Sequence, residues 1–155
     1  MAANFSSTGS DTFPAGHVVK TSKAYRGTGG HINTSSNSVS DSGISLSVPA
    51  ATGSNYYFIT FSTAGQHGSG NSSDRIYLYC SKNGASQAKI SGGEVYWTGG
   101  ITGSPHDFSS MTWTDASSIT AGTNVYKIYY SCNAGTFYMV HSGYPYSFIV
   151  QEISV

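Results

Sequence analysis

Hydrophobic and polar residues alternate along much of this chain with the period of two that is typical of β-strands. Within the run from Val39 to Val48, Ile44, Leu46 and Val48 alternate with Ser45 and Ser47, and Pro49 ends the run. Turn-forming residues such as Asn83-Gly84 separate the runs. The pattern predicts strands over residues 17–21, 39–48, 56–62, 74–81, 87–91, 94–98, 108–114, 125–131, 136–141 and 147–155. No segment of ten or more residues has helical spacing, so we expect an all-β, antiparallel β-sandwich, with a jelly roll as the favoured topology.

Three of these strands are apolar on both faces: Asn55–Phe61, Val125–Tyr130 and Phe137–Val140. A two-layer sandwich needs only one apolar face per strand, so something must cover the second face. We expect the three strands to form an inner sheet whose second side packs on other copies of the chain. The predicted oligomer interface consists of Tyr56, Phe58, Val125, Tyr129, Tyr138 and Val140.

The first 15 residues are polar and have no strand periodicity apart from Phe5 and Phe13. The sequence therefore predicts an extended N-terminal arm at 1–15 and one domain at 16–155. Phe5 and Phe13 are the candidate apolar anchors of this arm on another protein. The start has no basic or apolar region typical of a secretory signal, and no run is long enough to span a bilayer.

Composition limits the choice of partners for this 155-residue chain. Charged residues make up 9%, and seven basic residues balance seven acidic ones. This balance gives no electrostatic reason to expect a nucleic-acid partner or insertion into a membrane. Ser and Thr together number 43, with 19 Gly, which is typical of rigid extracellular or particle-bound β-proteins.

Catalytic signatures are missing from the sequence. There is no G-x-S-x-G elbow and no phosphate-binding glycine signature ahead of a helix. The carboxylates are spread singly, and nothing in the sequence brings Glu94 and Asp107 together as a glycosidase pair. We therefore predict that the protein is not an enzyme and uses no cofactor.

Cysteine and histidine give no metal-site spacing either. Cys80 and Cys132 lie in strand contexts and are expected to be buried thiols, with a disulfide as the alternative. The five histidines lack a strand pair or cysteine partner typical of metal sites. His141 near a threefold axis could supply three imidazoles, but a hydrogen-bonded histidine is preferred, so no metal is predicted.

The segment from Tyr96 to Trp113 is the candidate recognition loop. It concentrates aromatic rings and short polar side chains around glycine- and serine-rich turns, an arrangement that suits stacking on sugar rings. The possible glycan-binding residues are Tyr96, Trp97, His106, Asp107 and Trp113. The alternative is that Trp97 and Trp113 only close the ends of the sandwich.

Several short motifs resemble a domain of tailed-phage appendage proteins. The motifs are Phe13-Pro14-Ala15-Gly16-His17-Val18-Val19, the run from Asp41 to Pro49, Val125 to Tyr130, and the closing run from Ser147 to Ile153. Over residues 13–155 the chain resembles the C-terminal head domain of fibre, appendage or decoration proteins from marine and cyanobacterial phages. The resemblance implies a trimeric jelly roll similar to the tumour-necrosis-factor and C1q heads, and it brings no catalytic residues.

The resulting hypothesis is a non-enzymatic bacteriophage virion surface protein. A homotrimer, assembled in the bacterial host cytoplasm, would attach through its arm to a capsid or tail protein of the same virion. It would act as a capsid decoration (cement) protein or as a tail-fibre tip that binds a host surface glycan. A lectin-like carbohydrate-binding or receptor-binding module is the alternative.

Overall fold

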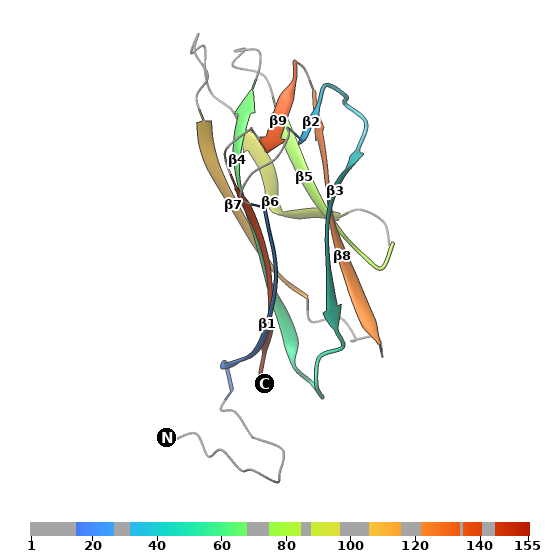
Figure 1. Cartoon of the computed structure of the whole chain (residues 1–155), viewed down its shortest axis with the longest axis vertical. Coiled ribbons are helices and arrows are strands. Elements are labelled where there is room, and N and C mark those ends of the chain that lie inside the picture. Colours follow the sequence, from blue (N-terminus) through green and yellow to red (C-terminus); the bar gives the residue numbers. More distant parts are fainter. Residues whose placement is uncertain are drawn as a thin grey trace.

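A computed structural model of the chain describes residues 15–26, 32–67, 75–84, 88–96, 106–115, 122–133, 135–140 and 145–155. These residues form ten β-strands (Figure 1). The strands are β1 (Val18–Arg26), β2 (Ile32–Thr34), β3 (Ser40–Pro49), β4 (Tyr56–His67), β5 (Arg75–Lys82), β6 (Ala88–Tyr96), β7 (His106–Asp115), β8 (Thr123–Cys132), β9 (Phe137–Val140) and β10 (Tyr146–Ile153). Within the described part of the chain, no helix is long and apolar enough to cross a membrane.

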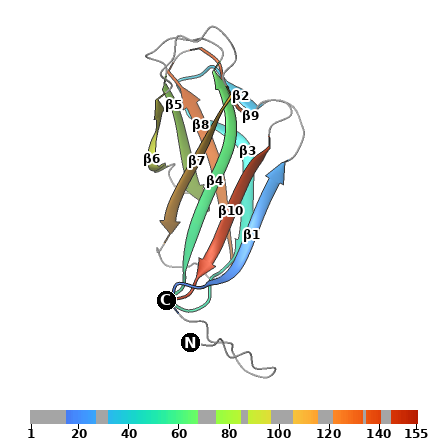
Figure 2. The ribbon, with the colours of Figure 1, turned by 90° about the vertical axis from the view of Figure 1, so that its left-hand side faces the viewer.

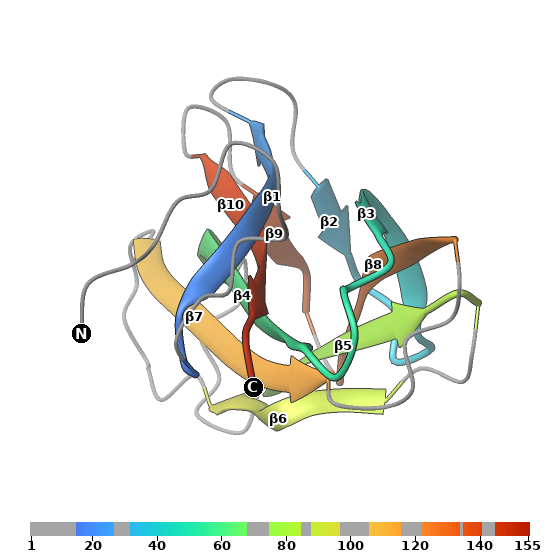
Figure 3. The ribbon, with the colours of Figure 1, turned by 90° about the horizontal axis from the view of Figure 1, so that it is seen from below.

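The strands form two antiparallel sheets packed face to face. The four-stranded sheet has the order β3-β8-β5-β6. The six-stranded sheet has the order β1-β10-β4-β9-β2, with β7 on the other side of β4. Figure 2 looks onto the outer side of the six-stranded sheet, where β7, β4, β10 and β1 lie side by side, and Figure 3 shows the two layers from below.

The strand order identifies a jelly roll. The chain crosses from one sheet to the other between β2 and β3, β3 and β4, β4 and β5, β6 and β7, β7 and β8, and β8 and β9. These crossings leave β1-β10-β4-β7 facing β3-β8-β5-β6, which is the arrangement of eight strands in two Greek keys. The fold class predicted from the sequence is confirmed.

Three details of the sequence prediction are wrong, the first being that it contains no strand at β2. The expected strands at 87–91 and 94–98 are one strand, β6. The expected inner sheet of three two-faced strands does not exist, because β4 and β9 lie in the six-stranded sheet while β8 lies in the four-stranded sheet. The physical reason is that β4 and β8 each have paired neighbours on both sides. A second apolar face marks a strand flanked by others, and it does not specify which sheet the strand joins.

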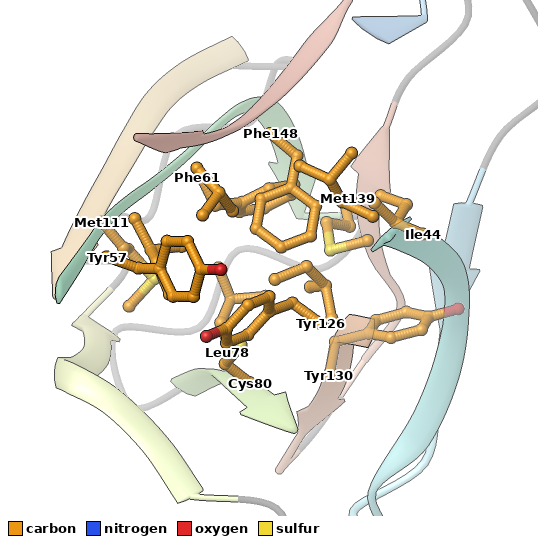
Figure 4. Packing of buried hydrophobic residues seen from close by; sticks show 14 of the residues in the cluster. Ile44, Tyr57, Phe61, Leu78, Cys80, Met111, Tyr126, Tyr130, Met139 and Phe148 are labelled. Atoms are coloured by element: carbon orange, nitrogen blue, oxygen red, sulfur yellow. The ribbon is translucent and has the colours of Figure 1, made fainter. Parts of the chain in front are cut away.

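The core fills the space between the sheets with side chains from their inner faces (Figure 4). Phe61 of β4 and Phe148 of β10 meet edge to face, with ring centroids 6.0 Å apart. Alternation predicts the β3 contribution correctly: Ile44, Leu46 and Val48 are buried while the serines between them are exposed. Burial of such side chains stabilises the fold by about 1.5–3 kcal/mol each.

Three core tyrosines connect the two sheets through their hydroxyl groups. Tyr126 of β8 donates a 2.6 Å hydrogen bond to Asp115 of β7. Tyr130 of β8 donates a 2.5 Å bond to the carbonyl of Asn33 in β2. In the opposite direction, Tyr57 of β4 donates to the carbonyl of Pro49 at the end of β3. Each ring fills the core, and each hydroxyl finds its acceptor in the other sheet.

A buried glutamate ties the connection between β3 and β4 to the last strand. The Glu152 carboxylate, 4% exposed, accepts the backbone N–H of Thr52 at 2.6 Å and the amide N–H of Asn55 at 2.8 Å. Asn55 Oδ1 in turn accepts the Val155 N–H at 3.4 Å. These bonds fix the lower end of β4, where the exposed aromatic residues of that strand begin.

The two cysteines are buried thiols that form no disulfide, as the sequence predicted. Cys80 of β5 is paired with Ile128 of β8, and Cys132 is paired with Ile76. The two thiols are therefore four residues apart along paired strands, roughly 13 Å, whereas a disulfide needs Cα atoms within about 7 Å.

The tyrosine bonds between the sheets predict a measurable loss of stability. We expect Tyr126→Phe to lower the free energy of unfolding by about 1.5–3 kcal/mol, because it removes a buried hydrogen bond to a carboxylate. The measurement is urea unfolding followed by circular dichroism. Tyr129→Phe, on the outer side of the same strand, is the matched control and should change stability by less than about 0.5 kcal/mol. Equal losses in the two variants would contradict the role given to Tyr126.

Candidate binding surfaces

The predicted interface residues lie on the outer faces of both sheets. Tyr56 and Tyr138 are half-buried on the six-stranded sheet, and Phe58 there is 36% exposed. Val125 and Tyr129 are half-buried on the four-stranded sheet. The Val140 side chain lies outside the described residues. None of the five described side chains belongs to the core, but they form two sets on opposite sides of the sandwich, so the prediction of one common surface is wrong.

The outer face of the six-stranded sheet is rich in hydroxyl groups, and we call it the hydroxyl face. On strands β1, β4, β7 and β10 its described side chains are Thr21, Lys23, Tyr25, Tyr56, Phe58, Thr60, Ser62, Ser110, Thr112, Thr114, Ser147, Ile149 and Gln151, and β2 and β9 add Asn33 and Tyr138. Strand register aligns them in rows across the sheet, as in Thr112–Thr60–Ile149–Lys23. Ser62 and Ser110, neighbours in another row, have hydroxyl oxygens 3.1 Å apart.

Charge is nearly absent from the hydroxyl face. Among its described side chains, Lys23 carries the only formal charge, and it lies on the edge strand β1. The central strands β4 and β10 place Phe58 and Ile149 in the middle of the face, while Tyr25, 66% exposed, lies at its edge. The face therefore combines a low charge with apolar anchors among short side chains.

The outer face of the four-stranded sheet has a different chemistry, and we call it the tyrosine face. Its described side chains include Tyr77, Tyr79 and Tyr129 together with Asp41 and Lys127. The three tyrosines are half-buried. Lys127 Nζ lies 3.4 Å from Asp41 Oδ2, and both side chains are more than 40% exposed. The alternation of Tyr77 and Tyr79 with Leu78 and Cys80 was visible in the sequence, but their alignment with Tyr129 depends on strand pairing.

The predicted glycan-binding cluster is not assembled as expected. Trp113 packs inward, stacked on Phe148 with ring centroids 6.5 Å apart, and contacts the core. Along β4 it is paired with Ile59, whereas His106 and Asp107 are paired with Gln66 and Gly65 at the other end of β7. Six residues of strand, roughly 20 Å, therefore separate Trp113 from Asp107. The half-buried indole of Trp113 packs against the core, which agrees with the alternative that this residue closes the sandwich.

The other predicted sites are described only in part. Tyr96 ends β6 and His106 begins β7, but their side chains, like that of Asp107, lie outside the described residues. Trp97, His141 and the anchors Phe5 and Phe13 also lie outside them. No group of three His, Cys, Asp or Glu residues in the described ranges could hold a metal ion. For Glu94 and Asp107 only the backbone is described.

The ionisable side chains inside the sandwich pair with one another or are buried in the protonated form. Lys82 Nζ lies 2.7 Å from Asp115 Oδ2, the same carboxylate oxygen that accepts the Tyr126 hydroxyl. Burial, reinforced by the Asp115 charge, raises the pKa of Cys80 to about 12. Burial is also the main cause of the raised pKa of Tyr126 and of Tyr57. These groups therefore stay protonated and neutral at physiological pH.

Comparison with known proteins does not show a family for this chain. No protein-family model matches the chain, and no curated protein matches its sequence. Among solved structures it is similar to Eiger TNF from S. frugiperda, with 10% identity, a TM-score of 0.46, and coverage of 90% of this chain and 96% of that chain. It is also similar to the CBM22-1 xylan-binding domain of Xyn10C from Paenibacillus barcinonensis, with 8% identity, a TM-score of 0.26, and coverage of 93% and 99%. The jelly-roll assignment rests on the strand order, and both likenesses concern the fold alone.

The raised pKa of Cys80 predicts a loss of stability in alkali. Between its ordinary pKa of 9.0 and about 12, the thiol is protonated in the folded state and ionised in the unfolded state. The folded state then binds more protons, so the free energy of unfolding falls as the pH rises, by about 1.4 kcal/mol per pH unit from this group. Urea unfolding at pH 8, 9, 10 and 11 measures the slope. Cys80→Ala should have a shallower slope above pH 9, and an unchanged slope would refute this assignment.

Proposed function

We propose that this protein is a non-enzymatic structural subunit of a tailed-phage particle and that it forms a cyclic homotrimer through its hydroxyl face. The observation that carries the proposal is the chemistry of that face: a broad sheet surface with almost no charge and with Phe58, Ile149 and Tyr56 among short side chains. In a cyclic trimer each subunit uses two complementary patches, and a surface this wide provides room for both.

Low charge favours association through this face. The cores of protein interfaces are depleted of charged residues and enriched in aromatic ones. Ser and Thr also have fewer rotatable bonds than Lys or Glu, so their ordering on association costs less entropy. Phe58, 36% exposed in the single chain, is the natural anchor because it lies between Thr114 of β7 and Gln151 of β10, in the middle of the sheet.

The tyrosine face is less suited to close the trimer. Its exposed Asp41–Lys127 ion pair would have to be desolvated in an interface core, and the desolvation cost can exceed the attraction between the charges. Of the predicted interface residues, we therefore retain Tyr56, Phe58 and Tyr138 and exclude Val125 and Tyr129.

The location on a phage particle is supported by the resemblance of residues 13–155 to phage appendage and decoration heads. The arm at 1–15 would dock to a capsid or tail protein, and the trimer would stand on the virion surface. Both roles expected from the sequence, capsid decoration protein and appendage tip, are compatible with a trimer attached through this arm. Surface exposure on a particle also agrees with the predominance of Ser, Thr and Gly over charged residues.

The oligomeric state of the purified protein tests the proposed trimer. Light scattering after size exclusion should give three times the 16.3 kDa mass of one chain. Phe58→Asp or Ile149→Asp should convert the trimer to a folded monomer, because an unpaired carboxylate in an interface costs several kcal/mol. Ser45→Asp, at an exposed position on the opposite sheet, is the control and should stay trimeric. A wild-type monomer at about 50 μM, well above a micromolar dissociation constant, would exclude the proposed assembly.

Removal of the N-terminal arm tests the proposed location on a phage particle. Deleting residues 2–15 should leave the trimer intact and abolish binding to particles that lack the protein. Electron microscopy of particles decorated with labelled protein reports the binding and its position. If the protein is a decoration protein, heads without it should rupture at lower internal pressure, whereas an appendage tip should leave the heads unchanged. Full binding by the shortened chain would contradict the role of the arm.

A further inference from the structure

We propose that the tyrosine face binds an uncharged oligosaccharide, with Tyr79 and Tyr129 stacking on sugar rings and Asp41 and Lys127 bonding to sugar hydroxyls. This inference goes beyond the proposed function and does not depend on trimer formation. It concerns strands β3, β5 and β8, and not the segment from Tyr96 to Trp113 in which the sequence placed recognition.

Strand register places the aromatic rings close together. Tyr79 of β5 is paired directly with Tyr129 of β8, so their Cβ atoms are about 4.5–5.5 Å apart. Tyr77 lies two residues from Tyr79 on the same face of the same strand, about 7 Å away. The three rings therefore form a compact platform rather than scattered surface tyrosines.

The position of the Tyr79 hydroxyl shows that its ring leans along the sheet. That hydroxyl lies 3.5 Å from Ser131 Oγ, and Ser131 is paired with Tyr77, not with Tyr79. The ring thus reaches diagonally across to β8, and Ser131 on this outer face is only 1% exposed. A half-buried ring that lies on the sheet has one side covered and the other side facing outward. An outward-facing aromatic surface is what the apolar side of a pyranose ring stacks on.

Polar groups border the platform at Tyr129. Asp41 is paired with Tyr129 across β3 and β8, and Lys127 is two residues away on β8. The Asp41 carboxylate is held by the Gly43 N–H at 2.8 Å through Oδ1 and by Lys127 Nζ at 3.4 Å through Oδ2. Held in this way, a carboxylate and an ammonium group can accept from and donate to neighbouring hydroxyls of one sugar with little loss of side-chain entropy.

The charge balance favours a neutral ligand. Among the described side chains of this face, Asp41 and Lys127 neutralise each other, so they neither attract a phosphate nor select an acidic sugar. A protein partner is less suited, because a stable interface buries about 800 Å² on each side and this platform has only three aromatic rings. Weak single-site affinity is typical of small exposed surfaces, and repetition of the site on a particle would strengthen attachment.

The test is titration with soluble neutral hexasaccharides: cellohexaose, xylohexaose, maltohexaose and mannohexaose. At least one should bind the full chain with a dissociation constant of about 0.1–1 mM by calorimetry. Tyr79→Ala should weaken this binding at least about tenfold. Val18→Ala, which shortens an exposed apolar side chain at the start of β1, outside both faces, is the control and should leave it unchanged. The ligands are monovalent, so a change in oligomeric state does not alter the measured constant.

A measurement without substitutions covers variants that fail to fold. Amide NMR signals of residues 77–81 and 127–131 should shift on addition of the binding hexasaccharide, and those of β1 should not. The proposal is overturned if none of the four sugars binds at about 10 mM, ten times the weakest expected dissociation constant. It is equally overturned if Tyr79→Ala binds as wild type does, or if the shifted signals lie elsewhere. Loss of the trimer with sugar binding intact would count against the proposed assembly alone.

Discussion

The fixed relation between the two sheets depends on tyrosines that cross the core. Tyr126 and Tyr130 donate from the four-stranded sheet to the six-stranded sheet, and Tyr57 donates in the opposite direction. Their rings supply apolar contact, while their hydroxyls require an acceptor at one place in the facing sheet. Sliding of one sheet over the other would leave these buried hydroxyls without acceptors. The constraint therefore fixes the position of the sheets relative to each other, while the alternation along each strand sets which residues face inward and which face outward.

Two chemically distinct outer faces follow from this constraint. The inner residues of β4 and β10 direct Phe58 and Ile149 to the outer side of one sheet, among threonines and serines. The inner residues of β5 and β8 direct Tyr79 and Tyr129 to the outer side of the other, beside an ion pair. The faces point in opposite directions, so subunits can associate through the hydroxyl face while the tyrosine face stays open. Under the two proposals above, such a sandwich would use one face for assembly and the other for recognition.

Local alternation was sufficient to predict strands and core, but it did not predict strand pairing. The period-two pattern of β3 identified Ile44 and Val48 as buried, and the same rule located most other strands. It could not assign β4 and β8 to different sheets, because pairing depends on contacts between residues far apart in the sequence. The place of Trp113 could not be predicted for a related reason: an indole near a glycine-rich loop suits a binding site, but here β7 directs it onto Phe148. The tyrosine platform likewise could not be predicted, because it depends on the pairing of β5 with β8.

We propose that copies of this chain associate through the hydroxyl face. A cryo-electron microscopy or crystal structure of the purified full-length protein, resolved to side chains, tests it most directly. We expect a threefold assembly in which Phe58 and Ile149 touch a neighbouring subunit while Tyr79 and Tyr129 face solvent. An assembly built through the tyrosine face, with Phe58 in water, would contradict it.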